Sequence, residues 1–583
     1  QTLRGTYTVL LFFAAPTLAA LLTLVFLYAC MFATTGRAAG RFGPASSVSP
    51  EEVLSSDRWD QLVSRVQDSG DKTEKNSLLL GVNATDNTPI LVPRSIFAEH
   101  AHLLGDSGSG KTSIGIATIL SQLIRSQECS VVVLDLKGDD LALFHGVAKD
   151  AEDAGLQFRW FTNQLEHSTY AFNPLRQAPL KRMTLYQKVD MLTAAMGLQY
   201  GRDYGRAYYS DANARMLHAA LEHHGDIASF EQLADILADP NALPGIDREM
   251  RQAGAHLGTI VNRLADSEPL NVIPNDGQAA SVVDASIEFT DVFRQPQAIH
   301  FHLTSTIGAT SSSEIARVAL YSLITAATAV PPRERVQTFV VIDEFQRIVA
   351  GNIEMLLQLA RSLNIGIILA NQSLMDLKTA GIDLIPAISA NTRFRQIFAA
   401  SNLEEQERIS RGSGEALTYK QAWQEYISTF VTAIAAGRNL SEQITPRLRM
   451  NDILLATDDP LQSIVQIRRG DGYAQYGGMP FVMRSTYPIT FDEYRERKKE
   501  SWPEPSEETL VSQVDRPPRT PGARPGWFGE QDVFVDQPEG ASSGAHFLDQ
   551  LYQQQLASSD PSAPANRSAP ENSSDEQEPT HDD

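Results

Sequence analysis

A glycine-rich segment at residues 105–112 carries the residue types that bind the phosphate groups of a nucleotide. It reads G-D-S-G-S-G-K-T and matches the pattern G-x-x-x-x-G-K-[ST] at every fixed position. An apolar strand pattern precedes it and an apolar helical pattern follows it. The glycines let the backbone wrap around phosphates with its N–H groups pointing inward. The predicted phosphate-binding residues are Gly105, Asp106, Ser107, Gly108, Ser109, Gly110, Lys111 and Thr112.

The last two residues of this segment have predicted roles in catalysis. We expect the Lys111 amine to reach the β- and γ-phosphates and the Thr112 hydroxyl to ligate Mg²⁺. The predicted cofactors are therefore ATP and Mg²⁺. A chance glycine-rich turn is the alternative, but average residue usage gives the full pattern in only about one chain in a hundred of this length.

Two adjacent carboxylates, Asp343 and Glu344, follow a hydrophobic strand pattern at residues 338–342. In the same sheet as the phosphate loop, Asp343 can hold Mg²⁺ and Glu344 can polarise the attacking water. A solvated turn is the alternative for such a pair. The next strand pattern is followed by Gln372, which we predict to lie beside the γ-phosphate as a sensor of hydrolysis. The alternative is a loop glutamine with its hydrogen bonds satisfied locally.

Three arginines, Arg361, Arg393 and Arg395, could reach the site of a neighbouring subunit and stabilise charge on the transferred phosphoryl group. Arg361 is the best candidate, with a structural or surface role as the alternative for each. Residues 135–139 (D-L-K-G-D) end another strand pattern and resemble a second acidic site. We expect them to orient the first site or close a turn rather than to act in catalysis directly.

Strand and helix patterns alternate from about residue 78 to residue 499, which predicts an α/β sheet, here a RecA-like P-loop core. From about residue 176 to residue 290, apolar residues recur at three- and four-residue spacing. This stretch predicts an all-α insertion between two strands. The predicted strands are His102–Leu104, Ser130–Leu134, Ala298–Leu303, Thr338–Ile342, Gly366–Ala370, Gln396–Ala399 and Ser463–Ile467; the predicted insertion helices are Leu180–Leu198, Arg206–His223, Phe230–Leu237 and Ile246–Asp266.

An uncharged apolar stretch, Tyr7–Phe32, predicts a transmembrane helix near the N-terminus. As a helix it would be about 39 Å long, which exceeds the hydrocarbon thickness of a bilayer. A signal peptide is the alternative, although its apolar region is usually shorter. Arg37 and Arg41 follow the stretch while only Arg4 precedes it, which favours a cytoplasmic location for the rest of the chain. The sequence begins with Gln1 and not with Met, so we expect that an upstream segment is missing, which could contain a second membrane span.

The C-terminal part of the chain, from Glu500 to Asp583, has the composition of a disordered acidic tail. It contains 11 prolines, 17 acidic and 4 basic residues, and few aliphatic ones, so it buries too little surface to offset the entropy of ordering. The net charge of the whole chain is −22, of which the tail accounts for −13. Residues 1–499 are therefore not broadly basic, which excludes nucleic-acid binding spread over the protein surface. Any contacts with nucleic acid would be confined to a groove or a pore.

The chain therefore has six predicted parts. In order, they are an anchor at 1–36, a connector at 37–76, the first part of the nucleotide-binding domain at 77–175, the all-α insertion at 176–290, the second part of the nucleotide-binding domain at 291–499 and the tail at 500–583. The two cysteines, Cys30 and Cys129, are too few for a disulfide framework or a cysteine metal site, and they indicate a reducing compartment.

Taken in order, these motifs resemble the type IV secretion coupling proteins, the TraD/TraG-like branch of the FtsK–HerA superfamily. The resemblance covers about residues 77–490 and is carried by HLLGDSGSGKTS, VVVLDLKGD, AFNPL, VVIDEF, QLARSLNIGIILANQSL and ANTRFRQIF. The chain between Lys111 and Asp343 is long for a simple P-loop core, and the all-α insertion accounts for its length. The single predicted span departs from the two spans that members often have.

This resemblance implies a hexameric ring at the cytoplasmic face of the bacterial inner membrane. It implies a DNA-translocating motor whose ATP hydrolysis is stimulated by DNA, and delivery of a relaxase joined to single-stranded DNA to a type IV secretion channel. By motif position, Lys111 and Thr112 take the P-loop roles, Asp343 and Glu344 the metal and water roles, Gln372 the sensor role and Arg361 the arginine role. The acidic tail resembles the tails with which some members bind accessory proteins.

Two other functions are compatible with the sequence. The low basicity of the body and the acidic tail also fit a receptor that recruits protein effectors to the channel, with little engagement of DNA. A chromosome-segregation pump of the FtsK type is less consistent with this sequence, because such pumps typically carry several membrane spans and a C-terminal winged helix, whereas this chain ends in an acidic tail.

Overall fold

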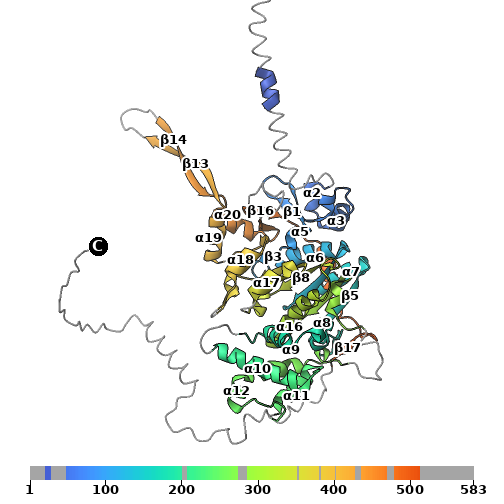
Figure 1. The fold of residues 1–583 in the computed structure, drawn as a ribbon. Coiled ribbons are helices and arrows are strands. Elements are labelled where there is room, and N and C mark those ends of the chain that lie inside the picture. Colours follow the sequence, from blue (N-terminus) through green and yellow to red (C-terminus); the bar gives the residue numbers. More distant parts are fainter. Residues whose placement is uncertain are drawn as a thin grey trace, which may run out of the picture. The chain divides into compact units, whose positions relative to one another are not determined.

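The computed structural model describes residues 20–27, 48–138, 140–199, 206–239, 241–273, 285–306, 308–350, 353–379, 382–400, 402–426, 435–468 and 478–512. The predicted α/β class is confirmed, since one sheet of 11 strands runs through the described chain in the order β2-β1-β16-β15-β12-β3-β9-β8-β4-β7-β5. Figure 1 labels β1, β3, β5, β8 and β16 of this sheet. Its strands are β1 (Ser77–Asn83), β2 (Pro89–Pro93), β3 (Ala101–Leu104), β4 (Cys129–Asp135), β5 (Gln157–Thr162), β7 (Gln297–His302), β8 (Gln337–Asp343), β9 (Ile365–Asn371), β12 (Phe394–Ile397), β15 (Gln462–Ile467) and β16 (Phe481–Arg484).

The seven strands from β12 to β5 are parallel, and the four from β15 to β2 extend the sheet in antiparallel fashion. Strand β3, which leads into the phosphate loop, is separated by β9 from β8, which ends in the carboxylate pair. Because parallel strands present their carboxyl ends at one edge of a sheet, this order brings the predicted catalytic residues to the same edge.

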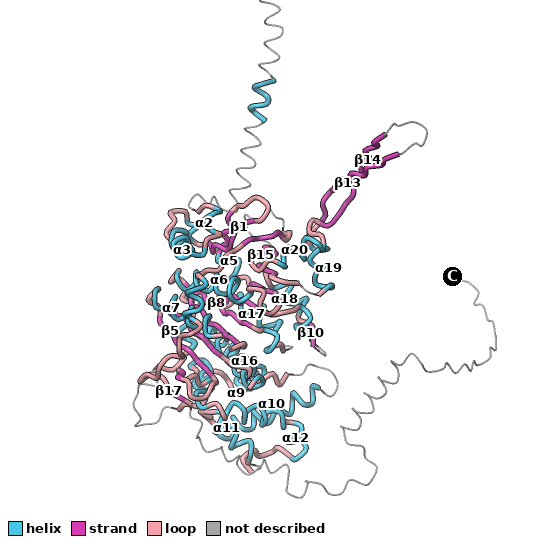
Figure 2. Tube along the Cα trace, turned by 180° about the vertical axis from the view of Figure 1, so that it is seen from behind, coloured by secondary structure: helices cyan, strands magenta, loops and turns pink. Residues whose placement is uncertain are grey.

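The inner parallel strands β3, β9, β8, β4 and β7 are buried along nearly all of their length, so they are largely apolar. In β4, Val131 and Val133 join a core with α6 (Ala117–Arg125) and α7 (Leu141–Asp153). Val132 and Leu134 join a second core on the opposite face, with α16 (Ala309–Thr328) and α17 (Ile353–Ser362). Successive side chains of a strand alternate between faces, and this alternation produces the two helix layers (Figure 2).

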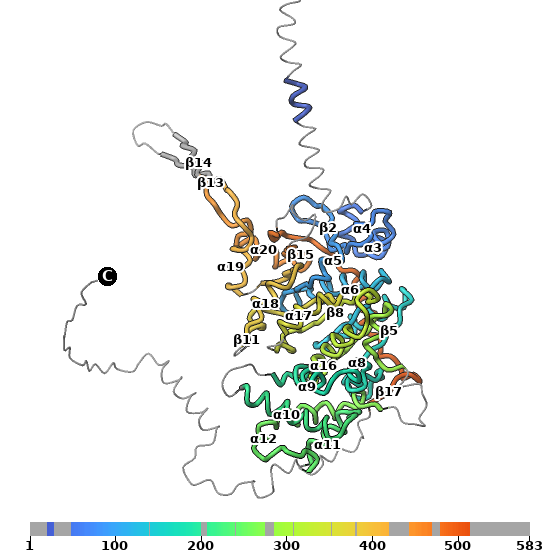
Figure 3. The backbone as a smooth tube through the Cα atoms, viewed as in Figure 1, coloured from blue at the N-terminus to red at the C-terminus, as the bar shows by residue number. Residues whose placement is uncertain are grey.

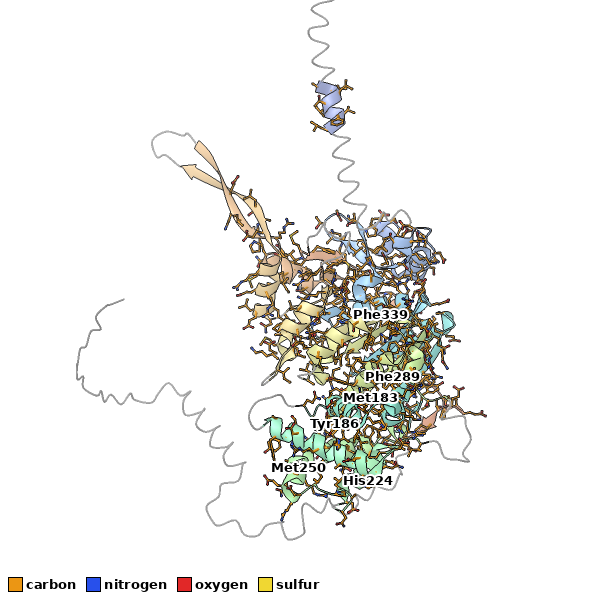
Figure 4. All side chains as sticks on the ribbon, viewed as in Figure 1. Met183, Tyr186, His224, Met250, Phe289 and Phe339 are labelled. Carbon is orange, nitrogen blue, oxygen red and sulfur yellow. The ribbon has the colours of Figure 1, made fainter. Side chains whose placement is uncertain are left out.

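Helices dominate the chain between β6 (Ser168–Thr169) and β7. Figure 2 shows several of these helices lying together, and the described residues between β6 and β7 form no strand. These helices share a core with α16, against which α9 and α13 pack. Phe289, which Figure 4 labels, belongs to this core, and its ring centroid lies 5.0 Å from that of Phe172. The helices are α8 (Ala178–Arg182), α9 (Leu185–Ala195), α10 (Arg206–His224), α11 (Phe230–Ala238), α12 (Arg248–Ala253), α13 (Ala255–Ala265) and α15 (Phe289–Val292).

The stretch expected to be a connector contains three short helices, α2 (Pro50–Val53), α3 (Trp59–Gln67) and α4 (Lys72–Lys75). One face of α3, with Trp59 and Leu62, packs into a separate core with Leu79 of β1 and Leu91 of β2. The antiparallel strands β1 and β2, absent from the sequence prediction, therefore support a small helical layer of their own.

The expectation that the tail is disordered from residue 500 is wrong for residues 500–512. Strand β17 (Leu510–Val511) pairs antiparallel with β6, which lies far earlier in the chain. Figure 3 shows β17 in the orange-red of the C-terminal part of the described chain. The ring of Trp502 stacks on that of Phe144, with centroids 4.5 Å apart. Residues 500–512, here named the strap, are thus part of the folded body, and the remainder of the predicted tail lies outside the described residues.

Two further segments bear on the sequence predictions. Strands β13 (Glu415–Tyr426) and β14 (Ala435–Pro446) form a two-stranded antiparallel sheet that no sequence pattern predicted. Residues 20–27 are helical, while the rest of the predicted membrane span lies outside the described residues. Among the helices that are described, none has both the length and the apolar character needed to cross a membrane.

Candidate active site at the carboxyl edge of the sheet

The phosphate loop follows β3 and curls into a π-helical turn at Lys111–Ile116, which continues as α6. Gly108 and Gly110 have φ angles of 81° and 91°, in the left-handed region that favours glycine. A Cβ atom on Gly105 would lie 2.5 Å from the Ser109 Oγ and 2.9 Å from the Cβ of Phe398. Backbone conformation at two positions and crowding at a third therefore require the glycines of the motif.

Thr112 and Asp343 meet across the sheet, since the Thr112 hydroxyl donates a 2.9 Å hydrogen bond to the Asp343 carboxylate. A hydroxyl and a carboxylate are hard oxygen ligands of the kind that Mg²⁺ takes in nucleotide sites. The two residues expected to hold the metal thus come together from segments 231 positions apart. This pair fits a Mg²⁺ ion bound between the loop and the end of β8.

Burial raises the pKa of the Asp343 carboxyl to about 6, and the nearby Asp135 carboxylate adds to the rise. Lys111 and the Thr112 hydroxyl act on this pKa in the opposite direction. A divalent cation bound here would stabilise the ionised form, because its charge would offset the cost of desolvating the carboxylate.

The Lys111 side chain is buried, and its Nζ lies 3.9 Å from the Glu344 Oε1. Within the described part of the chain, this amine makes no hydrogen bond. A buried ammonium without an acceptor is costly, and phosphate oxygens would supply the missing acceptors. Its position favours phosphate binding over a purely structural role.

Glu344 is held in place by two glutamine side chains. The Gln372 amide donates to both carboxylate oxygens of Glu344 at 3.1 Å, and the Gln346 amide donates to one of them. The backbone of Glu344 has a φ of 56°, which is uncommon for a residue with a side chain and turns the chain sharply at the end of β8. The structure brings Lys111, Glu344 and Gln372 together, as the motif positions predict.

His102 of β3 links the loop strand to β9. It is the first residue of the motif HLLGDSGSGKTS, but no role was predicted for it. Its Nε2 lies 2.5 Å from the Oδ1 of Asn371, the residue before Gln372. Burial lowers the pKa of His102 to about 4, so the imidazole is neutral at pH 7. This contact fixes the end of β9 and, with it, the backbone that carries Gln372.

A cavity of about 550 Å³ opens at this edge of the sheet. One wall consists of the phosphate loop, Asp343 and Glu344, and a second wall comes from residues 487–491, Tyr494 and Arg497. The Tyr494 hydroxyl, on α21 (Phe491–Arg497), donates a 2.9 Å hydrogen bond to Asp140. This second wall was not predicted, and the aromatic residues at 487, 491 and 494 were its only signal in the sequence.

The arginine candidates lie apart from this cluster. Arg361 pairs with Glu99 at 2.8 Å, and its side chain is 58% exposed; Arg393 pairs with the same carboxylate. Burial lowers the pKa of Arg395 to about 10, with Arg468 and Arg408 as further causes. None of the three lines the cavity of its own chain, as far as the described residues extend.

Asp135, predicted to orient the first site or close a turn, accepts hydrogen bonds from the backbone N–H groups of Lys137 and Gly138 at 3.0 and 3.2 Å. It closes the turn after β4 and also lines the cavity. It stands in register with Asp343 on the neighbouring strand.

Among solved structures, an unbound form of the bacterial conjugative coupling protein TrwB, shortened at its N-terminus, resembles this chain with a TM-score of 0.50 at 13% identity. The match covers 74% of this chain and 92% of that one. The two proteins share a fold. TrwB in complex with a non-hydrolysable GTP analogue matches with the same TM-score at 12% identity, over 74% of this chain and 94% of that one. The resemblance to coupling proteins inferred from the motifs is thereby confirmed at the level of the fold.

No family model matches the sequence, and no curated protein sequence matches it. At this level of identity the likeness concerns the fold, so any function must be argued from the site itself.

Proposed function

We propose that this chain is an ATPase of the type IV secretion coupling kind, which binds Mg²⁺ and ATP and uses hydrolysis to move a substrate toward the secretion channel. The observation that carries the proposal is the cluster at the carboxyl edge of the sheet. Thr112 is bonded to Asp343, and Gln372 holds Glu344 beside the amine of Lys111, which makes no hydrogen bond within the described residues. Phosphoryl transfer needs little more than positioning and charge stabilisation, and these residue types supply both.

In this mechanism, the loop N–H groups and Lys111 bind and orient the phosphates. Thr112 and Asp343 would hold Mg²⁺, which supplies charge neutralisation on the phosphate oxygens. Glu344 accepts a proton from the attacking water, and Gln372 keeps its carboxylate in position. After hydrolysis, the bond between Gln372 and Glu344 offers a direct route by which β9 senses the change.

We further propose a homohexameric ring in which Arg361 serves the neighbouring subunit. Its exposure and its place outside its own cavity fit a residue that acts in trans. In a head-to-tail ring, each interface joins one surface of a subunit to a different surface of the next. The pair with Glu99 would hold the guanidinium in place until the subunits meet.

The proposed substrate is single-stranded DNA joined to a relaxase, and the proposed location is the bacterial inner membrane, with the ATPase domain in the cytoplasm. The fold shared with a conjugative coupling protein and the apolar stretch Tyr7–Phe32 support this assignment. The second candidate is a receptor for protein effectors, favoured by the acidic balance of the chain. In that case, the all-α insertion or the tail would bind the cargo.

ATP turnover of the full chain, measured with and without single-stranded DNA, tests the proposal. We expect stimulation by DNA at salt below physiological strength and loss of turnover in Lys111→Ala. Turnover that DNA leaves unchanged would favour the receptor. Pull-downs with residues 176–290 and with the tail as separate baits would then show whether protein cargo binds without a DNA-processing enzyme. Absence of any adenine nucleotide binding would overturn both candidate functions.

A further inference from the structure

A second group of polar side chains lies next to the nucleotide cavity, which one of its members, Asp135, also lines, at the carboxyl ends of two adjacent strands. Asp135, His300 and His302 are 4%, 0% and 1% exposed. One potential ligand atom from each lies within 4.8 Å of the others. Nothing in the proposed ATPase mechanism uses the two histidines.

The strand register places these three residues together. Asp135 ends β4 and stands opposite His302 of β7, while His300 is two residues earlier on β7 and therefore on the same face. The pairing joins segments that are far apart in the chain, and both strands lie inside the parallel part of the sheet. The cluster is thus fixed by rigid elements and not by loops.

The distances between the Asp135 carboxylate and the two imidazole rings are too long for hydrogen bonds, but they suit pairs of ligands on one metal ion. The Asp135 Oδ2 lies 3.8 Å from the His300 Nε2 and 3.6 Å from the His302 Nδ1. Two ligands at about 2.1 Å from a tetrahedral ion are about 3.4 Å apart. Neither of these two nitrogens has a hydrogen-bond partner within the described chain. Buried imidazole nitrogens without partners cost free energy, and a cation would satisfy both at once.

The carboxylate is already oriented as a ligand. The Asp135 Oδ1 accepts the backbone N–H groups of Lys137 and Gly138, which leaves Oδ2 directed at the histidines. Backbone donors that hold a ligating carboxylate are the usual outer support of a metal site. This support comes from the turn after β4, so it is independent of the two histidines.

Aromatic rings pack against the two histidines. The Phe144 ring lies 5.3 Å from that of His300, and the Trp502 ring lies 5.2 Å from that of His302. Trp502 belongs to the strap, which is held over the cluster by the pairing of β17 with β6. Such a dry surrounding strengthens the binding of a cation to charged and polar ligands.

We propose that Asp135, His300 and His302 bind one divalent transition-metal ion of the Zn²⁺ class, which fixes the ends of β4 and β7 beneath the strap. Two imidazoles and one carboxylate form a ligand set that suits Zn²⁺, whereas Mg²⁺ prefers oxygen ligands alone. The site differs from the Mg²⁺ site between Thr112 and Asp343, although Asp135 and Asp343 stand side by side. The proposal does not depend on ATP hydrolysis.

Zinc content and affinity of the full chain test this inference. Protein stripped of metal and titrated with Zn²⁺ alone should bind one ion per chain and unfold at a higher temperature. His302→Gln should weaken binding by more than the roughly 10–100-fold that loss of an outer support costs. Binding below one-tenth of an ion per chain, or an affinity unchanged in His302→Gln, would overturn the proposal.

Two control variants show whether the zinc binding belongs to this cluster. His100→Gln changes another buried histidine, which contacts the Leu357 carbonyl and the Ile367 N–H, and it should keep the zinc affinity. Thr112→Val removes the other proposed Mg²⁺ ligand without changing a charge beside Asp135, and it should also keep the zinc affinity. If His302→Gln does not fold, Co²⁺ added to the unchanged protein decides, because nitrogen and oxygen ligands in a four-coordinate site give strong visible bands. A spectrum identical to that of hydrated Co²⁺ would overturn the proposal.

Discussion

At the scale of single residues, the site depends on the Glu344 carboxylate, which the side-chain amides of Gln372 and Gln346 hold in position. Glu344→Gln removes the proton acceptor but keeps the shape and the capacity to bond with Gln372. We expect kcat to fall by about 10²–10⁴-fold while Mg²⁺–ATP stays bound, because general-base catalysis contributes on that order. Single-turnover hydrolysis and retention of labelled ATP on a gel-filtration column measure this. Glu354→Gln, an exposed change on α17, is the matched control and should leave turnover intact. Near-normal turnover in Glu344→Gln would refute the assignment of the base.

Asp343 predicts a dependence of metal binding on pH. Its pKa of about 6 lies above the ordinary value of 3.8, so between these values the folded chain binds a proton that the unfolded chain does not. The contribution of this group to stability is therefore present below its ordinary pKa and is lost as the pH rises through the raised one. Mg²⁺ needs the ionised form, so the affinity for Mg²⁺–nucleotide should fall by about tenfold per pH unit below the raised pKa.

A titration of fluorescent ATP analogue with Mg²⁺ between pH 5 and pH 8 measures this affinity. The same titration without Mg²⁺ is the control, and its pH dependence should be smaller. An affinity for Mg²⁺–nucleotide that stays level from pH 7 to pH 5 would contradict the role of Asp343 as a metal ligand.

At the scale of elements, the strap has a composition that predicted disorder, yet it packs on the folded body. Chains ending at residue 512 and at residue 499 differ only in the strap. The longer one should unfold at nearly the temperature of the full chain, because it keeps Trp502 on Phe144 and the pairing of β17 with β6. The shorter one should lose about 2 kcal/mol or more of stability, since a large aromatic contact is lost. Thermal unfolding followed by circular dichroism compares them. Equal midpoints would show that the strap does not stabilise the body.

The strands around the phosphate loop could be predicted because each is a short apolar run that ends in a polar or glycine-rich motif. The predicted strand Thr338–Ile342, for example, lies inside β8 and stops at the carboxylate pair. Strand β5 was missed because only its last two residues are buried, so its sequence lacks a continuous apolar run. The strap was missed for a related reason, since its prolines and acidic residues resemble the rest of the tail and only long-range packing orders it.

The sequence predicted those site residues that belong to local motifs. It did not predict the contacts that form only because strands distant in the chain lie side by side in the sheet. Lys111, Thr112, Asp343, Glu344 and Gln372 each stand in a recognisable local pattern. The contact of His102 with Asn371, and the meeting of Asp135 with His300 and His302, depend on the order of strands in the sheet, and one sequence alone does not specify that order.

At the scale of the whole molecule, the proposed ring makes a prediction about mixtures of inactive subunits. Lys111→Ala removes the phosphate site but keeps Arg361, and Arg361→Ala does the reverse. If Arg361 acts on the neighbouring subunit, an equal mixture contains sites in which an intact phosphate loop faces an intact arginine. Random assembly should then restore roughly a quarter of wild-type turnover, because half of the subunits have the loop and half of their neighbours supply the arginine.

Turnover of the mixture, assayed in parallel with each variant alone, measures this complementation. Lys111→Ala mixed with Arg393→Ala is the matched control for the second arginine that pairs with Glu99. A mixture no more active than its components would place Arg361 in a structural role within its own chain. Strong activity of Arg361→Ala by itself would contradict a catalytic role in either chain. Recovery specific to Arg361 requires adjacent subunits that share an active site, and so tests the ring and the arginine in a single measurement.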